Sequence, residues 1–148
     1  MRIALYQPDI AGNVGTILRT AACLGAGVDL IEPMGFPWGD RVLARSGMDY
    51  AARVEVKRHP DWATFEAGVG GRIVLATTKG AVRLDVARFE EDDVLLFGSE
   101  GAGVPDDVHA RADLRVAIPM MTGMRSLNVA VAAGIMLGEA LRQTGGWP

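Results

Sequence analysis

Three glycine-containing loops in the second half of the chain carry the residues best placed to bind a ligand. They read TTKG (77–80), GSEGAGVP (98–105) and PMMTGMRS (119–126), and each follows a short apolar run that is typical of a buried strand. Ligands of open α/β sheets bind at the carboxyl ends of strands, so the three loops together predict one ligand cradle. Taken singly, each loop is explained somewhat better as a tight turn than as a ligand site.

The residue types in these loops limit the chemistry that they can perform. The loops hold neither paired catalytic carboxylates nor a Ser/His/Asp arrangement, and GSEGAGVP lacks the adjacent lysine–serine pair of a phosphate-binding loop and the full G-x-G-x-x-G pattern. His59 and His109 are far apart and Cys23 is the single cysteine, so we expect no metal site. The loops therefore predict a ligand held mainly by backbone groups and apolar contact, with the methionines of the third loop able to pack on a flat ring.

Two helix beginnings add polar side chains to this picture. Asn13 precedes a run of helical periodicity and is a good N-cap. Arg19, on the same helix, has only small residues one turn to either side, which lets its guanidinium approach a backbone or a phosphate closely. Ser126 is expected to cap the last helix, with Arg125 and Asn128 beside it. For each of these residues a structural role and a ligand-binding role both fit the spacing.

The elements that position these residues alternate between strands and helices. Strands are predicted at 2–6, 28–31, 53–57, 72–77, 93–97 and 114–118, and helices at 14–25, 41–46, 61–67 and 127–142. Several of the strands are continuous apolar runs, as expected for strands that helices cover on both faces. The pattern predicts an α/β fold with an open, mostly parallel sheet of five or six strands.

Composition and charge set the outer limits. With 148 residues, 49% of them hydrophobic and 22% charged, the chain has the size and balance of one soluble domain, which we expect to span 1–148. A single cysteine excludes an internal disulfide and fits a cytoplasmic protein. No apolar run approaches the length of a membrane span, so no membrane association is expected. The net charge of −3 leaves room for RNA binding by a local basic patch.

The last predicted helix is apolar on every side. Between Leu127 and Leu141 only Asn128 and Glu139 are clearly polar. A helix of this kind must be buried all round, and in so small a domain only one face can meet the sheet. The other face predicts a homodimer through the C-terminal helix.

Three stretches of the sequence resemble the motifs of the SPOUT superfamily of RNA methyltransferases. They are NVGTILRTA (13–21), LLFGSEGAGVP (95–105) and IPMMTGMRSLNVAVAAGI (118–135), in the order and at the distances of that superfamily. LIEPMGFPWGDRVLARSGMDY (30–50), together with RH (58–59) and TTKG, narrows the resemblance to the minimal tRNA (cytidine/uridine-34-2′-O)-methyltransferases of the TrmL type. The resemblance covers essentially the whole chain and leaves no room for an appended RNA-binding domain.

The resemblance implies a parallel-sheet fold with a C-terminal trefoil knot, a homodimer, and S-adenosylmethionine held by three loops in the knot. Carried over onto this sequence, the cofactor-binding residues are Ala76, Thr77, Thr78, Gly98, Glu100, Ile118, Met120, Ser126 and Leu127. The reaction would be 2′-O-methylation of the wobble ribose of tRNA, which in this family means leucine isoacceptors. Arg125, Arg41 and Arg45 are candidates for contact with the RNA.

The resemblance also implies catalytic roles for Arg19, Asn13 and Asn128. A guanidinium has a pKa above about 12 and is a poor general base, so we expect Arg19 to orient and stabilise the developing alkoxide. Asn13 and Asn128 would position backbone and substrate. Three alternatives remain open: methylation of another tRNA or rRNA nucleotide, a non-catalytic dimeric RNA-binding module, and a generic nucleotide-binding protein.

Overall fold

The computed structural model describes residues 1–39, 41, 44, 50, 52–79 and 81–148. Its elements follow one another along the chain as β1 (Arg2–Tyr6), α1 (Ala11–Leu24), β2 (Gly27–Ile31), β3 (Val56–His59), α4 (Trp62–Gly68), β4 (Ile73–Ala76), β5 (Val82–Arg83), β6 (Val94–Phe97), α5 (Asp106–Arg111), β7 (Leu114–Ala117) and α6 (Val129–Thr144). The seven described strands form one sheet in the order β3-β2-β1-β6-β4-β7-β5. Every pairing between them is parallel, which confirms the predicted fold class.

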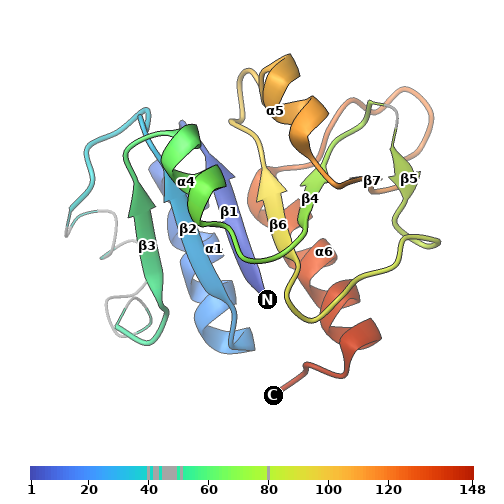
Figure 1. Cartoon of the computed structure of the whole chain (residues 1–148), viewed down its shortest axis with the longest axis horizontal. Coiled ribbons are helices and arrows are strands. Elements are labelled where there is room, and N and C mark those ends of the chain that lie inside the picture. Colours follow the sequence, from blue (N-terminus) through green and yellow to red (C-terminus); the bar gives the residue numbers. More distant parts are fainter. Residues whose placement is uncertain (40, 42–43, 45–49, 51, 80) are drawn as a thin grey trace.

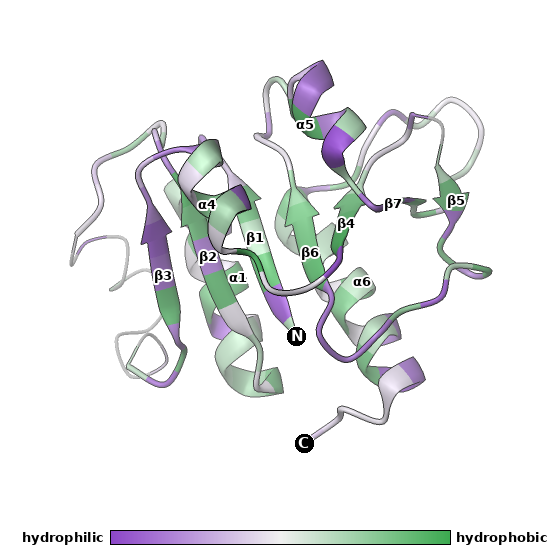
Figure 2. Cartoon of the chain, in the orientation of Figure 1, coloured by the Kyte–Doolittle hydropathy of each residue, from purple (hydrophilic) through white to green (hydrophobic). Residues whose placement is uncertain are grey.

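Helices cover both faces of the sheet. Alternate residues of β1 show the division, because Ile3 and Leu5 pack into the cluster that holds α1 and α6, whereas Ala4 and Tyr6 pack into the cluster with α4 and α5. The two pairs of helices lie behind and in front of the sheet in Figure 1. Strands β6 (VLLF) and β4 (IVLA), in the middle of the sheet, are apolar along their whole length, as the hydropathy colouring of Figure 2 shows.

Both long helices begin at other residues than the sequence indicated. Helix α1 starts at Ala11 with Ile10 at its N-cap and no side-chain cap, so the prediction that Asn13 caps this helix is wrong. Helix α6 starts at Val129, and Asn128, not Ser126, is the cap, its side chain accepting from the backbone N–H groups of Ala130 and Val131. Asn13 lies inside the first turn of α1, which leaves its amide free for contacts outside the helix.

The sheet differs from the prediction at its two edges. Strand β3 covers Val56–His59 instead of 53–57, and the two-residue strand β5 was not expected. Helix α5 was also missed. The helix predicted at 41–46 lies largely outside the described residues. Among the described helices, none combines the length and the apolar character that crossing a bilayer would require.

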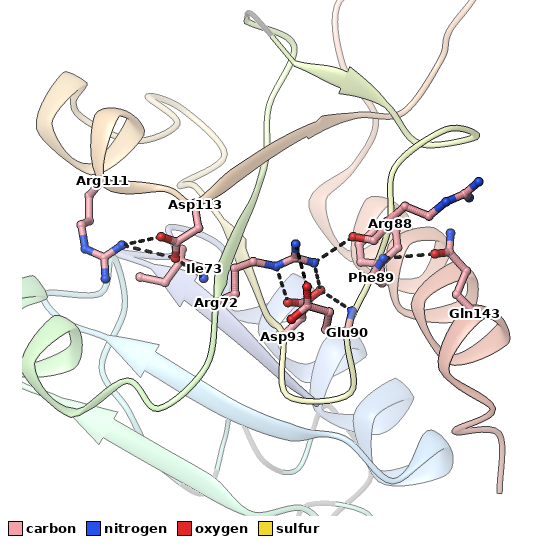
Figure 3. Close-up of polar contacts among 9 residues, drawn as sticks. All are labelled: Arg72, Ile73, Arg88, Phe89, Glu90, Asp93, Arg111, Asp113 and Gln143. Atoms are coloured by element: carbon pink, nitrogen blue, oxygen red, sulfur yellow. Dashed lines mark hydrogen bonds and ion pairs between the residues drawn. The ribbon is translucent and has the colours of Figure 1, made fainter.

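The amino ends of β4, β6 and β7 carry two groups of polar contacts (Figure 3). Asp93, which no solvent reaches, accepts from Nε and Nη2 of Arg72, both at 2.9 Å, and from the backbone N–H of Glu90 at 2.9 Å. Asp113 accepts from the backbone N–H of Ile73 at 2.8 Å. Gln143 of α6 accepts from the N–H of Phe89 at 3.1 Å, so a hydrogen bond connects the C-terminal helix to the segment that precedes β6.

Candidate active site

A cavity of about 700 Å³ opens at the other end of the same three strands, where β4, β6 and β7 finish. Because these strands are neighbours in the sheet, the three glycine-containing loops that follow them converge on one place. All nine residues proposed for cofactor binding line this cavity: Ala76, Thr77, Thr78, Gly98, Glu100, Ile118, Met120, Ser126 and Leu127. The predicted cradle is therefore a real cavity, although its lining does not by itself assign a role to each residue.

A chain of hydrogen bonds runs along one wall of the cavity. The amide of Asn13 donates to Oε1 of Glu100 at 3.0 Å, and the amide of Asn128 donates to Oδ1 of Asn13 at 2.9 Å. Oδ1 of Asn128 in turn accepts from the N–H groups of the first turn of α6, at 2.9 Å from Ala130 and 3.3 Å from Val131. Three segments that are far apart in the sequence are thereby joined side chain to side chain.

The direction of this chain is fixed at both of its ends. At α6 the backbone can only donate, so Asn128 must turn its oxygen to the helix and its NH₂ group to Asn13. At the far end both oxygens of Glu100 accept hydrogen bonds, and Asn13 turns its NH₂ group to Oε1. The second oxygen of Glu100 accepts from the backbone N–H of Asp9 at 2.8 Å. Glu100 is thus a fixed part of the wall.

The loop after β6 is folded tightly back on itself. Ser99 and Gly103 exchange two backbone hydrogen bonds, at 3.0 and 2.9 Å, and Gly103 has φ of +67°. A Cβ added to Gly98 would lie 2.5 Å from the carbonyl carbon of Gly103, closer than real Cβ contacts. Glycine is required at position 98 for this reason, and the tight loop is what holds Glu100 toward Asn13.

The four arginines named from the sequence lie in different places. Arg125 lines the cavity and is exposed. Arg19 is exposed on α1 and is not among the described lining residues; its guanidinium lies 4.8 Å from the ring centroid of Tyr50. Arg41 is exposed and also outside the lining, and Arg45 falls outside the described residues. The structure therefore brings Asn13 and Asn128 together but does not bring Arg19 to them within one chain.

Sequence reasoning missed several lining residues. Phe97 and Val116 were predicted only as strand interior, yet both also reach the cavity. His109 and Asp106 come from helix α5, which had no clear sequence signal. Asp9, which does not line the cavity but supports its wall, was missed as well: besides donating to Glu100 at 2.8 Å, it accepts from the N–H of Gly101 at 3.2 Å. Nothing in the spacing of Asp9 marks a partner that follows about ninety residues later.

The lining suits an organic cofactor with a flat ring and several polar groups. Strand-end residues such as Phe97 and Val116 give an apolar floor, while Thr77, Thr78 and Ser126 supply hydroxyl groups at the rim. These features fit S-adenosylmethionine. Among the described residues, the carboxylates close enough to share a metal ion are those of Glu90, Asp92 and Asp93. They lie at the amino ends of the strands, away from the cavity, and Asp93 is already paired with Arg72.

Comparison with known proteins agrees with this geometry. A protein of Ancylobacter novellus that is named tRNA (cytidine(34)-2′-O)-methyltransferase is 52% identical, the match covering 99% of this chain and 95% of the relative. A solved structure described as giving structural insights into the 2-OH methylation of C/U34 on tRNA superimposes with a TM-score of 0.90 at 42% identity, covering 96% of this chain and 94% of the other.

The AdoMet-bound rRNA methyltransferase of Sinorhizobium meliloti superimposes with a TM-score of 0.84 at 32% identity, covering 95% of this chain and 55% of that longer one. The profile of the SpoU rRNA Methylase family matches residues 1–138, nearly the whole chain. The chain belongs to the SpoU rRNA methylase family.

Proposed function

We propose that this protein transfers a methyl group from S-adenosylmethionine to the ribose 2′-hydroxyl of the wobble nucleotide, C34 or U34, of tRNA. The observation that carries the proposal is the convergence of three loops on one cavity walled by the Glu100–Asn13–Asn128 chain. The relative named as a tRNA (cytidine(34)-2′-O)-methyltransferase supports the position, because it aligns along 99% of the chain. The AdoMet-bound relative supports the cofactor.

Within this proposal the chain's own residues bind, orient and stabilise. S-adenosylmethionine, when bound, supplies an electrophilic methyl group. Asn13 and Asn128 are held rigidly by Glu100 and by the first turn of α6, so the wall that they form is preorganised before any substrate arrives. Arg19 contributes a permanent positive charge that stabilises the 2′-oxygen as it loses its proton.

A homodimer through α6 accounts for the position of Arg19 and is part of the proposal. Leu127, Val131 and Ile135 follow one another at helical spacing, and these apolar side chains are 40%, 51% and 40% exposed. An apolar row of this kind favours a protein contact. Arg19 lies on α1, which packs beside α6, outside the cavity of its own chain. In the dimer Arg19 completes the site of the partner subunit, and Arg125, Arg41 and Arg45 contribute to the tRNA surface.

Methyl transfer to bulk tRNA tests the reaction. The purified protein is incubated with S-adenosylmethionine labelled in the methyl group and with tRNA from a strain that lacks the gene. We expect label in a 2′-O-methylated wobble nucleotide, with leucine isoacceptors as the first tRNAs to map. Label in another nucleotide would move the site of modification, and cofactor binding without transfer would favour a non-catalytic RNA-binding module.

Arg19→Ala tests the shared site. The variant is expected to keep cofactor binding and to lose at least about a hundredfold in turnover, because a stabilising charge is removed. Mixing it with Gly98→Ala, whose cofactor loop cannot close, should restore part of the activity, since a mixed dimer holds one site with an intact loop and the partner's Arg19. If Arg19→Ala retains full activity, or if mixing restores nothing, Arg19 does not act across subunits.

A further inference from the structure

A second, smaller cavity lies beside the first and has no role in the proposal above. It has a volume of about 350 Å³ and is formed where β2 and β3 end. Its walls are Glu32, Pro33, Met34, Phe36, Trp38, Arg58 and Pro60. Since all described strands of the sheet are parallel, this cavity lies at the carboxyl ends of the strands, as the candidate active site does.

The side chains of the second cavity are those that recognise a flat, uncharged ring. The guanidinium of Arg58 lies over the ring of Trp38, 5.7 Å from the ring centroid, and Phe36 lines the same space. Arg58 donates to Oε1 of Glu32, so much of its charge is already balanced. A pocket for a phosphate would present an unbalanced cation, whereas aromatic and guanidinium planes with a nearby carboxylate suit a nucleobase.

One short segment separates the two cavities. The backbone N–H of Gly35, in the loop of the second cavity, donates to the carbonyl of Pro8 at 2.9 Å. A Cβ added to Gly35 would lie 2.9 Å from Cα of Asp9, so the two loops are in close contact. Asp9 in turn donates to Glu100, which lines the first cavity. Asp9 lines neither cavity, but it contacts Glu100 of the first and the loop that carries the second.

We propose that the second cavity binds the base of a nucleotide adjacent to the methylated one in the RNA substrate. The base stacks on Trp38 beside Arg58, and the carboxylate of Glu32 accepts from an exocyclic amino group of the base. This inference rests on the proposed function, because it requires an RNA whose target ribose occupies the first cavity. It gives the enzyme a way to read sequence next to its target with residues of the same domain.

Two substitutions at Trp38 separate stacking from packing. Trp38 is half-buried and packs against the core, so a small residue there would also remove structural contacts. Trp38→Leu keeps an apolar side chain but removes the ring, whereas Trp38→Phe keeps a ring. We expect Trp38→Leu to raise KM for tRNA roughly tenfold and Trp38→Phe to raise it no more than about threefold. The dissociation constant for S-adenosylmethionine should be unchanged in both variants.

A second measurement identifies the nucleotide. Transfer is measured on tRNA transcripts that carry a single abasic site on one or the other side of the target nucleotide. With one of these transcripts the wild-type protein should show the raised KM, and Trp38→Leu should add no further loss, because the stacking partner is already missing. Equal KM values for the Leu and Phe variants, or losses that simply multiply on both abasic transcripts, would overturn the inference. A wild-type protein that methylates no tRNA would instead refute the proposed function.

Discussion

The two ends of strands β4, β6 and β7 use polar side chains in opposite ways. At the amino ends, Arg72 donates two hydrogen bonds to the carboxylate of Asp93, which no solvent reaches (Figure 3). At the carboxyl ends, Glu100, Asn13 and Asn128 form a hydrogen-bonded chain along an open cavity of about 700 Å³. The first arrangement leaves no room for a ligand, whereas the second presents one wall to it. Similar polar chemistry thus stabilises the fold at one end and prepares a binding site at the other.

The comparison predicts that damage at the amino ends lowers stability and damage at the carboxyl ends lowers function. A buried carboxylate that loses its cation is left uncompensated, and the loss is typically several kcal/mol. A hydrogen bond in an open wall carries less of the fold, but a bound cofactor depends on the position of that wall. Substitutions at the two ends should therefore separate the free energy of unfolding from the affinity for S-adenosylmethionine.

Arg72→Met should have the largest effect on stability. It removes both donors of the guanidinium to the buried Asp93 and is expected to lower the free energy of unfolding by about 3–5 kcal/mol. The hydrogen bond to Asp93 is also the main reason that the pKa of Arg72 is raised, as expected for a cation stabilised by its partner. Urea unfolding measures the loss, while the affinity of the folded variant for S-adenosylmethionine should be unchanged.

Arg83→Met is the matched control for Arg72→Met. Arg83 also forms a bidentate pair, with Asp85, but its side chain is 65% exposed. Water replaces such a pair at little cost, so the expected loss is small beside that of Arg72→Met. If both variants lost the same free energy of unfolding, the burial of Asp93 would not explain the stabilising role of the Arg72 pair.

Glu100→Gln should have the next largest effect, and this effect is on the affinity for S-adenosylmethionine. Asp9 N–H and the amide of Asn13 donate to different oxygens of Glu100, and glutamine replaces one of these oxygens with an NH₂ group that can only donate. If Asn13 rotates its amide to compensate, its NH₂ group meets that of Asn128, which cannot rotate because its oxygen caps α6. One hydrogen bond must therefore be lost. We expect an affinity for S-adenosylmethionine roughly tenfold to a hundredfold lower in a calorimetric titration.

Asp9→Asn gives the control in the same hydrogen-bonded region. Asparagine keeps one side-chain oxygen for the N–H of Gly101, and the backbone N–H of residue 9 still reaches Glu100. We expect an affinity within about threefold of the wild-type value. A loss as large as that of Glu100→Gln would show that negative charge near the loop, and not the direction of the hydrogen bonds, sets the affinity.

Much of the fold could be read from the sequence because the buried strands are short, continuous apolar runs. The predictions for β1, β2, β4, β6 and β7 agree with the structure to within one residue at most ends. The two-residue β5 carries no periodicity at all, and Val82 and Arg83 gain their strand geometry from pairing with β7. The three cradle loops could be predicted because glycines follow apolar runs at each strand end. The trefoil knot stays a prediction, as does the homodimer.

The partners of the site residues could not be predicted from spacing alone. Asn13 has the sequence signature of a cap, and only the tertiary fold shows that Ile10 takes the cap position and leaves Asn13 to Glu100. Ser126 was expected to cap α6, but Asn128 takes that position, since its residue type accepts equally well from backbone N–H groups. Asn128 also donates to Asn13, a partner more than a hundred residues away that the packing of α1 against α6 brings within reach.

The smallest predicted effect is a pH dependence of the free energy of unfolding. It comes from Glu139 of α6, near the amino ends of β4, β6 and β7. Glu139 accepts from Arg142 and from Gln143, and these hydrogen bonds, with that of Arg142 the larger, lower the pKa of Glu139 from 4.5 to about 2. A lowered pKa in the folded state adds stability above pH 4.5 that is lost as the pH falls toward 2. Because Glu139 and Arg142 lie at the surface, the contribution is at most about 1 kcal/mol. Glu139→Gln should therefore be slightly less stable than the wild type in urea unfolding at neutral pH. The difference in stability between the two proteins should shrink as the pH is lowered from 4.5 toward 2. A difference that stays constant would mean that the charge of Glu139 contributes nothing to stability.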